Sequence, residues 1–243
     1  MNRRMVCGGV ALGTGTATAA AVYFTRRLAH RSGATTGEVS QALPGDELVS
    51  DPRIETTRAI TIHAPIASVW PWVVQVGYHR GGWYTNARLD KLIWHIENPS
   101  ADRILPEFQH VQVGDTVPDG PPGTARFIVA KVEPGRVLAL HDPDGTHIPN
   151  TRFSWVFALR EIDRQTTRLI LRTRANFPAR WWMTPLAYLA LGPADFLLAH
   201  VMLLRGIKQR AERTAAHDLP APRGQRRRTG DEWTPAAPAA TTG

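Results

Sequence analysis

The chain has 243 residues, 43% of them hydrophobic, and is long enough to bury one hydrophobic core. Its formal net charge of +8 belongs to the two ends: residues 1–34 hold five arginines and no acidic residue, and residues 205–228 hold eight basic residues against two acidic ones. The single cysteine, Cys7, excludes an internal disulfide framework, and the nine histidines lack the spacing of a metal site. We therefore expect one domain, no metal, no cofactor and no nucleic-acid partner.

The N-terminus contains an uncharged stretch of 20 residues, 5–24, with arginines on both sides. A helix of that length crosses the ~30 Å hydrocarbon layer of a membrane. Glycines and threonines dilute its apolar content, so a cleaved secretory signal and a soluble arm are the alternatives. The Arg26-Arg27 pair stands where a signal would have small residues, which favours an uncleaved anchor over residues 1–27. The basic flank after the stretch favours a membrane-anchored protein with a cytoplasmic body.

Residues 28–54 are small and polar and show neither a helical nor a strand period. Pro44-Gly45-Asp46 indicates a single turn within them. We therefore expect a linker over this whole range, with the folded domain beginning after it.

The folded domain is expected to span residues 55–215. Residues 58–63 alternate between apolar and polar types, as a half-buried strand does. Pro65 suits the first turn of a helix, and the apolar residues that follow recur at helical spacing. Gly77 is expected to end this helix, and a Gly-Gly loop leads to a second helix that reaches Trp94.

Strands dominate the second half of the domain. The turns between them are short, which favours an antiparallel sheet. A long helix is then expected from Pro193 to about Ala215, and residues 216–243, rich in Pro, Ala and Arg, are expected to be a disordered tail. The four predicted strands are residues 126–132, 137–142, 151–162 and 166–177.

Several motifs resemble those of the SRPBCC superfamily, in particular a group of bacterial polyketide cyclase/dehydratase-like members. The resemblance covers about residues 43–213, and it departs from the group at His63, where relatives tend to have an aspartate. It implies an α+β helix-grip fold, in which a curved antiparallel sheet wraps around a long C-terminal helix and encloses a cavity. The motifs are RAITIHAP at 58–65, VWPWVVQVG at 69–77, RGGWY at 80–84, ADRILPE at 101–107 and VGD at 113–115.

Aromatic residues are the candidates for the wall of such a cavity, because a ligand held there is mostly apolar. A core position is the alternative for each, since aromatics at helical or strand spacing usually pack in the core. Trp83 and Tyr84 follow a Gly-Gly loop, where a core residue is less expected. The candidate wall residues are Trp72, Trp83, Tyr84, Trp94 and Trp155.

Three charged residues are candidates for polar contacts with a ligand. Arg80 is suited to hold an anionic group through paired hydrogen bonds, and Glu107 is suited to general acid/base chemistry if it is buried. A structural ion pair between the two is the alternative. Arg172, on the last predicted strand, either lines the cavity or faces water.

These observations support three hypotheses of function. The first is a membrane-tethered binding module that holds a lipid-like or polyketide-like molecule in its cavity. The second is a cyclase/dehydratase-type enzyme that uses Arg80 and Glu107. The third is an interaction domain whose cavity is filled by its own side chains.

The segment Asp142 to His147 is interpreted only as a hairpin turn.

Overall fold

A computed structural model of the chain describes residues 31–85, 100–143, 145–147, 150–177 and 196–218. The predicted anchor, the predicted second helix with Trp94 and most of the predicted tail lie outside these ranges. Within them, none of the helices combines the length and the hydropathy needed to cross a membrane.

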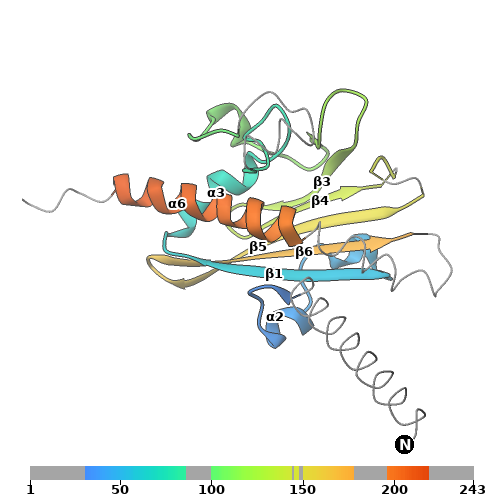
Figure 1. Ribbon diagram of the computed structural model, residues 1–243, viewed down its shortest axis with the longest axis horizontal. Helices are drawn as coiled ribbons and strands as arrows, with labels where there is room; N and C mark the ends of the chain where they lie inside the picture. Colours follow the sequence, from blue (N-terminus) through green and yellow to red (C-terminus); the bar gives the residue numbers. More distant parts are fainter. Residues whose placement is uncertain (1–30, 86–99, 144, 148–149, 178–195, 219–243) are drawn as a thin grey trace, which may run out of the picture.

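Six strands form one antiparallel sheet in the order β1-β6-β5-β4-β3-β2 (Figure 1). Strands β2 to β6 follow one another as neighbours, and β1 pairs with β6 at the far edge. The four predicted strands are confirmed, whereas β2 was missed because its three residues lie in a turn-rich stretch. The strands are β1 (Ile54–Ile62), β2 (Thr116–Pro118), β3 (Arg126–Glu133), β4 (Val137–Asp142), β5 (Arg152–Asp163) and β6 (Thr166–Asn176).

Two helices pack against one face of the sheet, which we call the concave face. They are α3 (Ile66–Val74), the helix predicted after Pro65, and α6 (Arg205–Asp218). Both lie on the same side of the sheet in Figure 1, and they contact each other as well as the strands. Lys208 Nζ donates to the Thr61 carbonyl oxygen at 2.8 Å, which fixes α6 beside β1.

The predicted long C-terminal helix is present but is not uniform. Residues Phe196–Leu204 are π-helical (η3), and the α-helix α6 begins only at Arg205. The side of this helix that faces the sheet is buried in both segments. Its buried residues include Ala199, Leu203, Leu204, Ile207 and Ala211, each exposed by 1% or less.

A glycine brings α6 into contact with the loop after α3. A Cβ atom at Gly206 would lie 2.4 Å from the Tyr84 Cβ and 2.6 Å from the Tyr84 carbonyl oxygen. Tyr84 itself has a φ of 55°, which is rare for a residue other than glycine. The close approach of helix and loop therefore depends on the missing side chain at position 206.

The opposite, convex face of the sheet is covered by residues 31–53, which we call the N-terminal strap. It contains α2 (Thr36–Ser40) and the 3-10 turn η1 (Asp46–Val49), and Figure 1 shows α2 on the side of the sheet away from α3 and α6. Leu43 of the strap packs on a second apolar cluster formed by convex-face residues of β1, β4, β5 and β6.

The prediction of a linker over residues 28–54 is thus wrong for residues 31–53. Apolar residues are sparse in this segment and show no period, so it has no sequence pattern of a packed element. Polar contacts with the sheet hold it in place instead.

Arginines of β6 make these polar contacts. Arg172 is 1% exposed, and its guanidinium donates to Asp46 Oδ2 at 2.7 Å and to the Gln41 carbonyl at 2.8 Å. Further bonds reach two carbonyls of the strap and Thr57 Oγ1. Arg168 pairs with Glu38 at 2.7 Å and thereby lowers the pKa of that carboxyl to about 2.

Arg172 therefore neither lines the concave face nor faces water. Its neighbours Leu171 and Thr173 point to the concave face, and the alternation of the strand turns Arg172 to the other side. This corrects its prediction as a ligand-binding residue.

Replacing Arg172 with methionine should destabilise the protein strongly. The change leaves the part-buried Asp46 carboxylate with only the Leu43 amide and the more distant Arg174, and several strap carbonyls lose this donor, for an expected loss of about 3–5 kcal/mol in the free energy of unfolding. Urea denaturation measures this loss. Arg152→Met is the control, because Arg152 is half exposed and pairs only with exposed Asp51, so its loss should cost under about 1 kcal/mol. Equal losses in the two variants would contradict the role given to Arg172.

Candidate functional site

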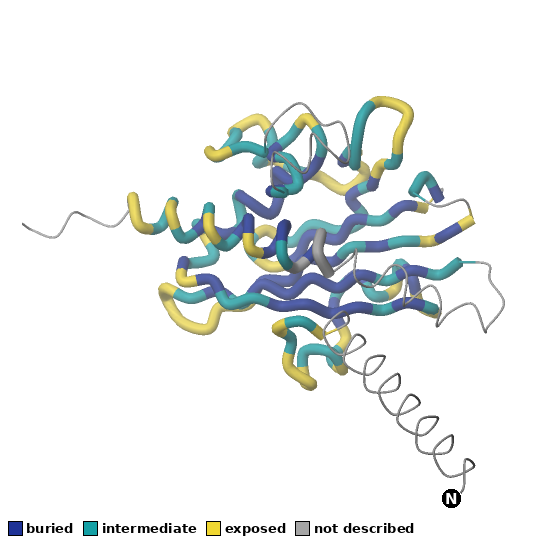
Figure 2. Tube along the Cα trace, viewed as in Figure 1, coloured by how far each residue is buried: buried dark blue, intermediate teal, exposed yellow. Residues whose placement is uncertain are grey.

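The concave face has two chemically different halves. Toward the hairpin between β5 and β6 it is apolar, with Ile62, Leu159 and Leu169 in the core cluster packed by α3 and α6. Toward the other end it carries aromatic and polar side chains, including Trp155 and Thr173. Figure 2 shows the central strands buried along most of their length, so both halves are covered. The second half is the candidate site.

Five aromatic side chains form what we call the aromatic wall in this half. The Trp83 ring lies 5.4 Å from Trp155 in an edge-to-face arrangement, and Phe127 stacks on Trp155 at 5.5 Å. The loop after α3 supplies Trp83, and its Nε1 donates to the Asp119 carbonyl at 3.1 Å. Because the rings come from that loop and from β3 and β5, the wall joins three separate elements. Its members are Trp83, Phe127, Phe153, Trp155 and Phe157.

Two buried polar atoms at the wall have no hydrogen-bond partner among the residues that the structure describes. They are the indole Nε1 of Trp155 and the hydroxyl of Thr173. The two residues face each other across β5 and β6 and point to the same side of the sheet. Buried polar groups without a partner are rare in native proteins, and a water or a ligand commonly accounts for them.

A histidine lies between two carboxylates at the edge of the wall. His147 Nδ1 is 2.8 Å from Asp142 Oδ2, and Nε2 is 3.2 Å from Asp119 Oδ2, an ion-pair distance without hydrogen-bond alignment. The imidazole packs 4.4 Å from the Phe127 ring. Burial alone would lower the pKa of His147, but the two carboxylates outweigh it and raise the pKa.

Asp142 is held in the charged form by the same turn. Burial favours its neutral form, but hydrogen bonds from Thr146 and His147 outweigh it and lower the pKa of Asp142 to about 2. The segment interpreted from sequence as a plain hairpin turn therefore places a charged group beside the aromatic wall. Sequence reasoning missed this cluster because Asp119 and His147 lie on different hairpins.

The structure brings together only some of the predicted site residues. Trp83 and Trp155 are in contact, as a shared wall requires. Trp72 and Tyr84 belong instead to the core between α3 and α6, where the Tyr84 hydroxyl donates to the Trp72 carbonyl at 2.7 Å. Burial raises the pKa of Tyr84 well above its ordinary value. Trp94 lies outside the described residues.

The predicted pair of Arg80 and Glu107 is not formed. Arg80 donates to the carbonyls of Val76 at 3.0 Å and Val74 at 2.9 Å, so it caps the C-terminal end of α3. Its guanidinium also lies 4.6 Å from the centre of the Phe108 ring. Glu107, in the short turn η2 (Pro106–Phe108), is exposed. Arg80 is thus engaged by the scaffold, and Glu107 lacks the burial that acid/base chemistry was expected to use.

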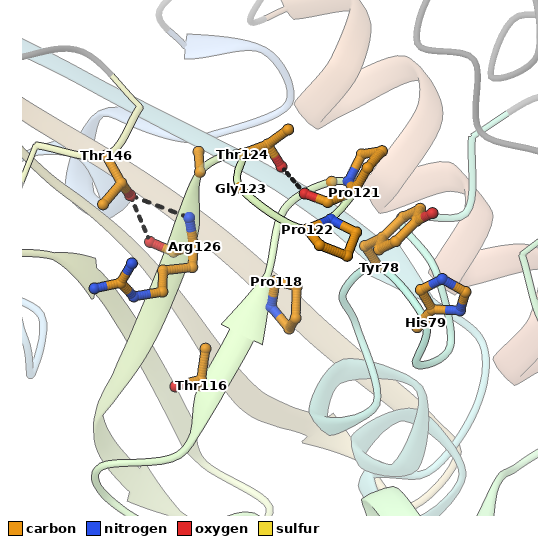
Figure 3. A pocket seen from close by; sticks show the side chains of 12 residues that line it. Tyr78, His79, Thr116, Pro118, Pro121, Pro122, Gly123, Thr124, Arg126 and Thr146 are labelled. Atoms are coloured by element: carbon orange, nitrogen blue, oxygen red, sulfur yellow. Dashed lines mark hydrogen bonds between the residues drawn. The ribbon is translucent and has the colours of Figure 1, made fainter.

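A separate pocket of about 490 Å³ opens on the surface beside the β2–β3 hairpin (Figure 3). Its lining includes Tyr78, the exposed His79 and the Gly-Pro-Pro-Gly turn at 120–123. Thr146 Oγ1 bonds to both backbone groups of Arg126 at 3.1 Å, which closes one end. The volume suits a small ligand, and polar side chains line the pocket beside the prolines and glycines, among them Tyr78, His79 and Arg126.

The strand order, the register and the placement of α3 and α6 define an α+β helix-grip fold. The fold implied by the resemblance to the SRPBCC superfamily is therefore confirmed, with a C-terminal helix on the concave face of a six-stranded antiparallel sheet.

The comparisons with known proteins bear on the fold alone. No protein-family model matches the sequence, and no curated protein matches it. Similar solved structures include a protein from Thermobifida fusca, with 13% identity and a TM-score of 0.42, covering 65% of this chain and 93% of that chain. An aromatase/cyclase from Streptomyces sp. R1128 has 14% identity and a TM-score of 0.37, covering 66% and 94%. A polyketide-cyclase-like protein from Corynebacterium glutamicum has 16% identity and a TM-score of 0.35, covering 69% and 96%.

Stability should depend on pH through His147. Its folded pKa is raised above the ordinary value of 6.5, so its contribution is fully present below pH 6.5 and is lost as pH rises through the folded pKa. His147→Asn should therefore cost on the order of 1–2 kcal/mol at pH 5.5 and much less at pH 9, measured by urea denaturation. The same substitution at exposed His110 is the control. A cost that does not change with pH would contradict the ion-pair role.

Proposed function

We propose that this protein binds a hydrophobic, lipid-like or polyketide-like small molecule at the aromatic wall on the concave face. The observation that carries the proposal is the edge-to-face contact of Trp83 with Trp155, next to the unpartnered Trp155 Nε1. Large rigid rings provide a wide apolar contact surface for little loss of side-chain entropy. The wall residues belong to the same buried cluster as the inward residues of α3 and α6, so the wall borders the part of the sheet that these two helices cover.

We further propose that residues 5–24 tether this binding module to a membrane. The uncharged stretch and its arginine flanks support the proposal. The strap limits how far the folded body can lie from the membrane. Ala59 N donates to the Ser32 carbonyl at 3.1 Å, so the folded body begins at about residue 31. Only about seven residues would then separate body and membrane, a reach of roughly 20–25 Å.

A cyclase-type activity is the second candidate function, and the Asp142–His147 pair favours it. A histidine fixed by a carboxylate and packed on an aromatic wall is suited to general acid/base catalysis. The contacts of Arg80 and the exposure of Glu107 do not support the version that relies on those two residues.

Removal of a wall tryptophan should abolish ligand retention without unfolding the protein. We expect the full chain, purified from membranes, to carry a co-purifying hydrophobic molecule detectable by native mass spectrometry and by solvent extraction. Trp83→Leu and Trp155→Leu should each reduce its occupancy about tenfold, because each deletes a face of the wall.

Tyr78→Leu is the matched control, since Tyr78 lines the separate surface pocket. If Tyr78→Leu loses the ligand and the tryptophan variants keep it, the ligand binds in that surface pocket and not at the wall. A folded wild-type chain that carries no molecule and takes up no added hydrophobic compound would contradict the proposed function.

A further inference from the structure

Trp155 differs from two other tryptophans whose indole groups lie inside the described body. Trp72 Nε1 donates to Thr214 Oγ1 at 3.3 Å, and Trp83 Nε1 donates to the Asp119 carbonyl at 3.1 Å. The Trp155 Nε1 atom is buried and has no acceptor. A buried N–H without an acceptor costs the free energy of its lost hydration. A hydrogen-bond acceptor on a molecule bound at the wall would offset that cost.

Thr173 provides a second unpartnered group at the same place. It is 3% exposed, and its hydroxyl has no partner. Trp155 and Thr173 are directly opposite each other across β5 and β6, and in an antiparallel pair such residues have Cβ atoms about 4.5–5.5 Å apart, so the two side chains leave the sheet at neighbouring points of the concave face.

The next strand extends this polar row. Thr56 lies opposite Thr173 across β1 and β6, on the same face. Arg58 Nη1 donates to Thr56 Oγ1 at 2.7 Å, so a buried guanidinium stands one residue pair further along the concave face. Indole, hydroxyl and guanidinium groups, all of them able to donate hydrogen bonds, thus follow one another along this row.

We propose that Trp155 and Thr173 together bind an oxygen acceptor, a carbonyl group, on the hydrophobic molecule that occupies the aromatic wall. The inference rests on the proposed function and names the chemical class of its ligand. An indole N–H only donates, so its partner must be an acceptor, and a hydroxyl is able to donate to the same oxygen. The ligand is accordingly a flat, largely apolar ketone and not a plain hydrocarbon.

A pair of probes of the same shape tests this inference. The full chain in phosphatidylcholine nanodiscs is equilibrated with fluorene or with 9-fluorenone, and bound probe is measured by dialysis and mass spectrometry, corrected for empty nanodiscs. We expect 9-fluorenone to bind about 5- to 10-fold more tightly than fluorene, as one or two hydrogen bonds would give. Trp155→Phe and Thr173→Val should each weaken the binding of 9-fluorenone severalfold more than the binding of fluorene, so that the preference for the ketone falls.

Stability provides a separate measurement for Thr173. Because the hydroxyl has no partner, Thr173→Val should leave the urea midpoint of the unliganded protein unchanged or raise it. Thr173→Ser keeps the hydroxyl and should keep the preference for the ketone. A clear loss of stability in Thr173→Val would mean that the hydroxyl has a partner within the protein, and it would overturn the inference.

The binding outcomes separate this inference from the proposed function. If both probes bind equally in the wild type and in the variants, the carbonyl site is overturned and hydrophobic binding stands. If neither probe binds, both are overturned. A ketone preference that survives both substitutions would overturn the assignment to Trp155 and Thr173.

Discussion

At their centres, strands β5 and β6 are apolar on both faces, and this requirement for cover on two sides governs where the helices and the strap lie. Phe157 and Leu171 point to the concave face, while Val156 and Ile170 point to the convex one, and all four are fully buried. The helices α3 and α6 cover the first face. The second is covered by a strap with few apolar residues, so arginines of β6 must fix it through hydrogen bonds and ion pairs.

The scaffold uses several of the side chains that looked most suited to bind a ligand. Arg80 caps a helix, Tyr84 fills the seam beside Gly206, and Arg172 fixes the strap. What is left at the aromatic wall is a set of neutral rings with two unsatisfied polar atoms and a charged histidine cluster at its edge. Two of the unpartnered buried polar atoms of the described residues thus lie at the aromatic wall, where an incoming molecule could bond to them.

The sequence was sufficient for the elements whose periodicity reports burial directly. The alternation of apolar and polar types over residues 58–63 predicted a strand, and the motifs predicted the fold. It was insufficient where a residue's partner is set by tertiary contacts. No local pattern shows that Asp119 will lie beside His147, or that Arg80 will bond to carbonyls that only the end of a helix leaves free. The strap was missed for the same reason, because its stabilising partners lie on another strand.

The contact between Arg172 and Asp46 joins residues 126 positions apart, with consequences for the order of folding. A ribosome adds about 5–20 residues per second, so on the order of ten seconds pass between synthesis of the strap and synthesis of its anchoring strand. During that time the strap has no docking surface, and closing so long a loop also slows the final step. The segment of the body that is made first is therefore fixed only after the last strand of the sheet has been made, and the convex face stays open to other contacts until β6 is complete.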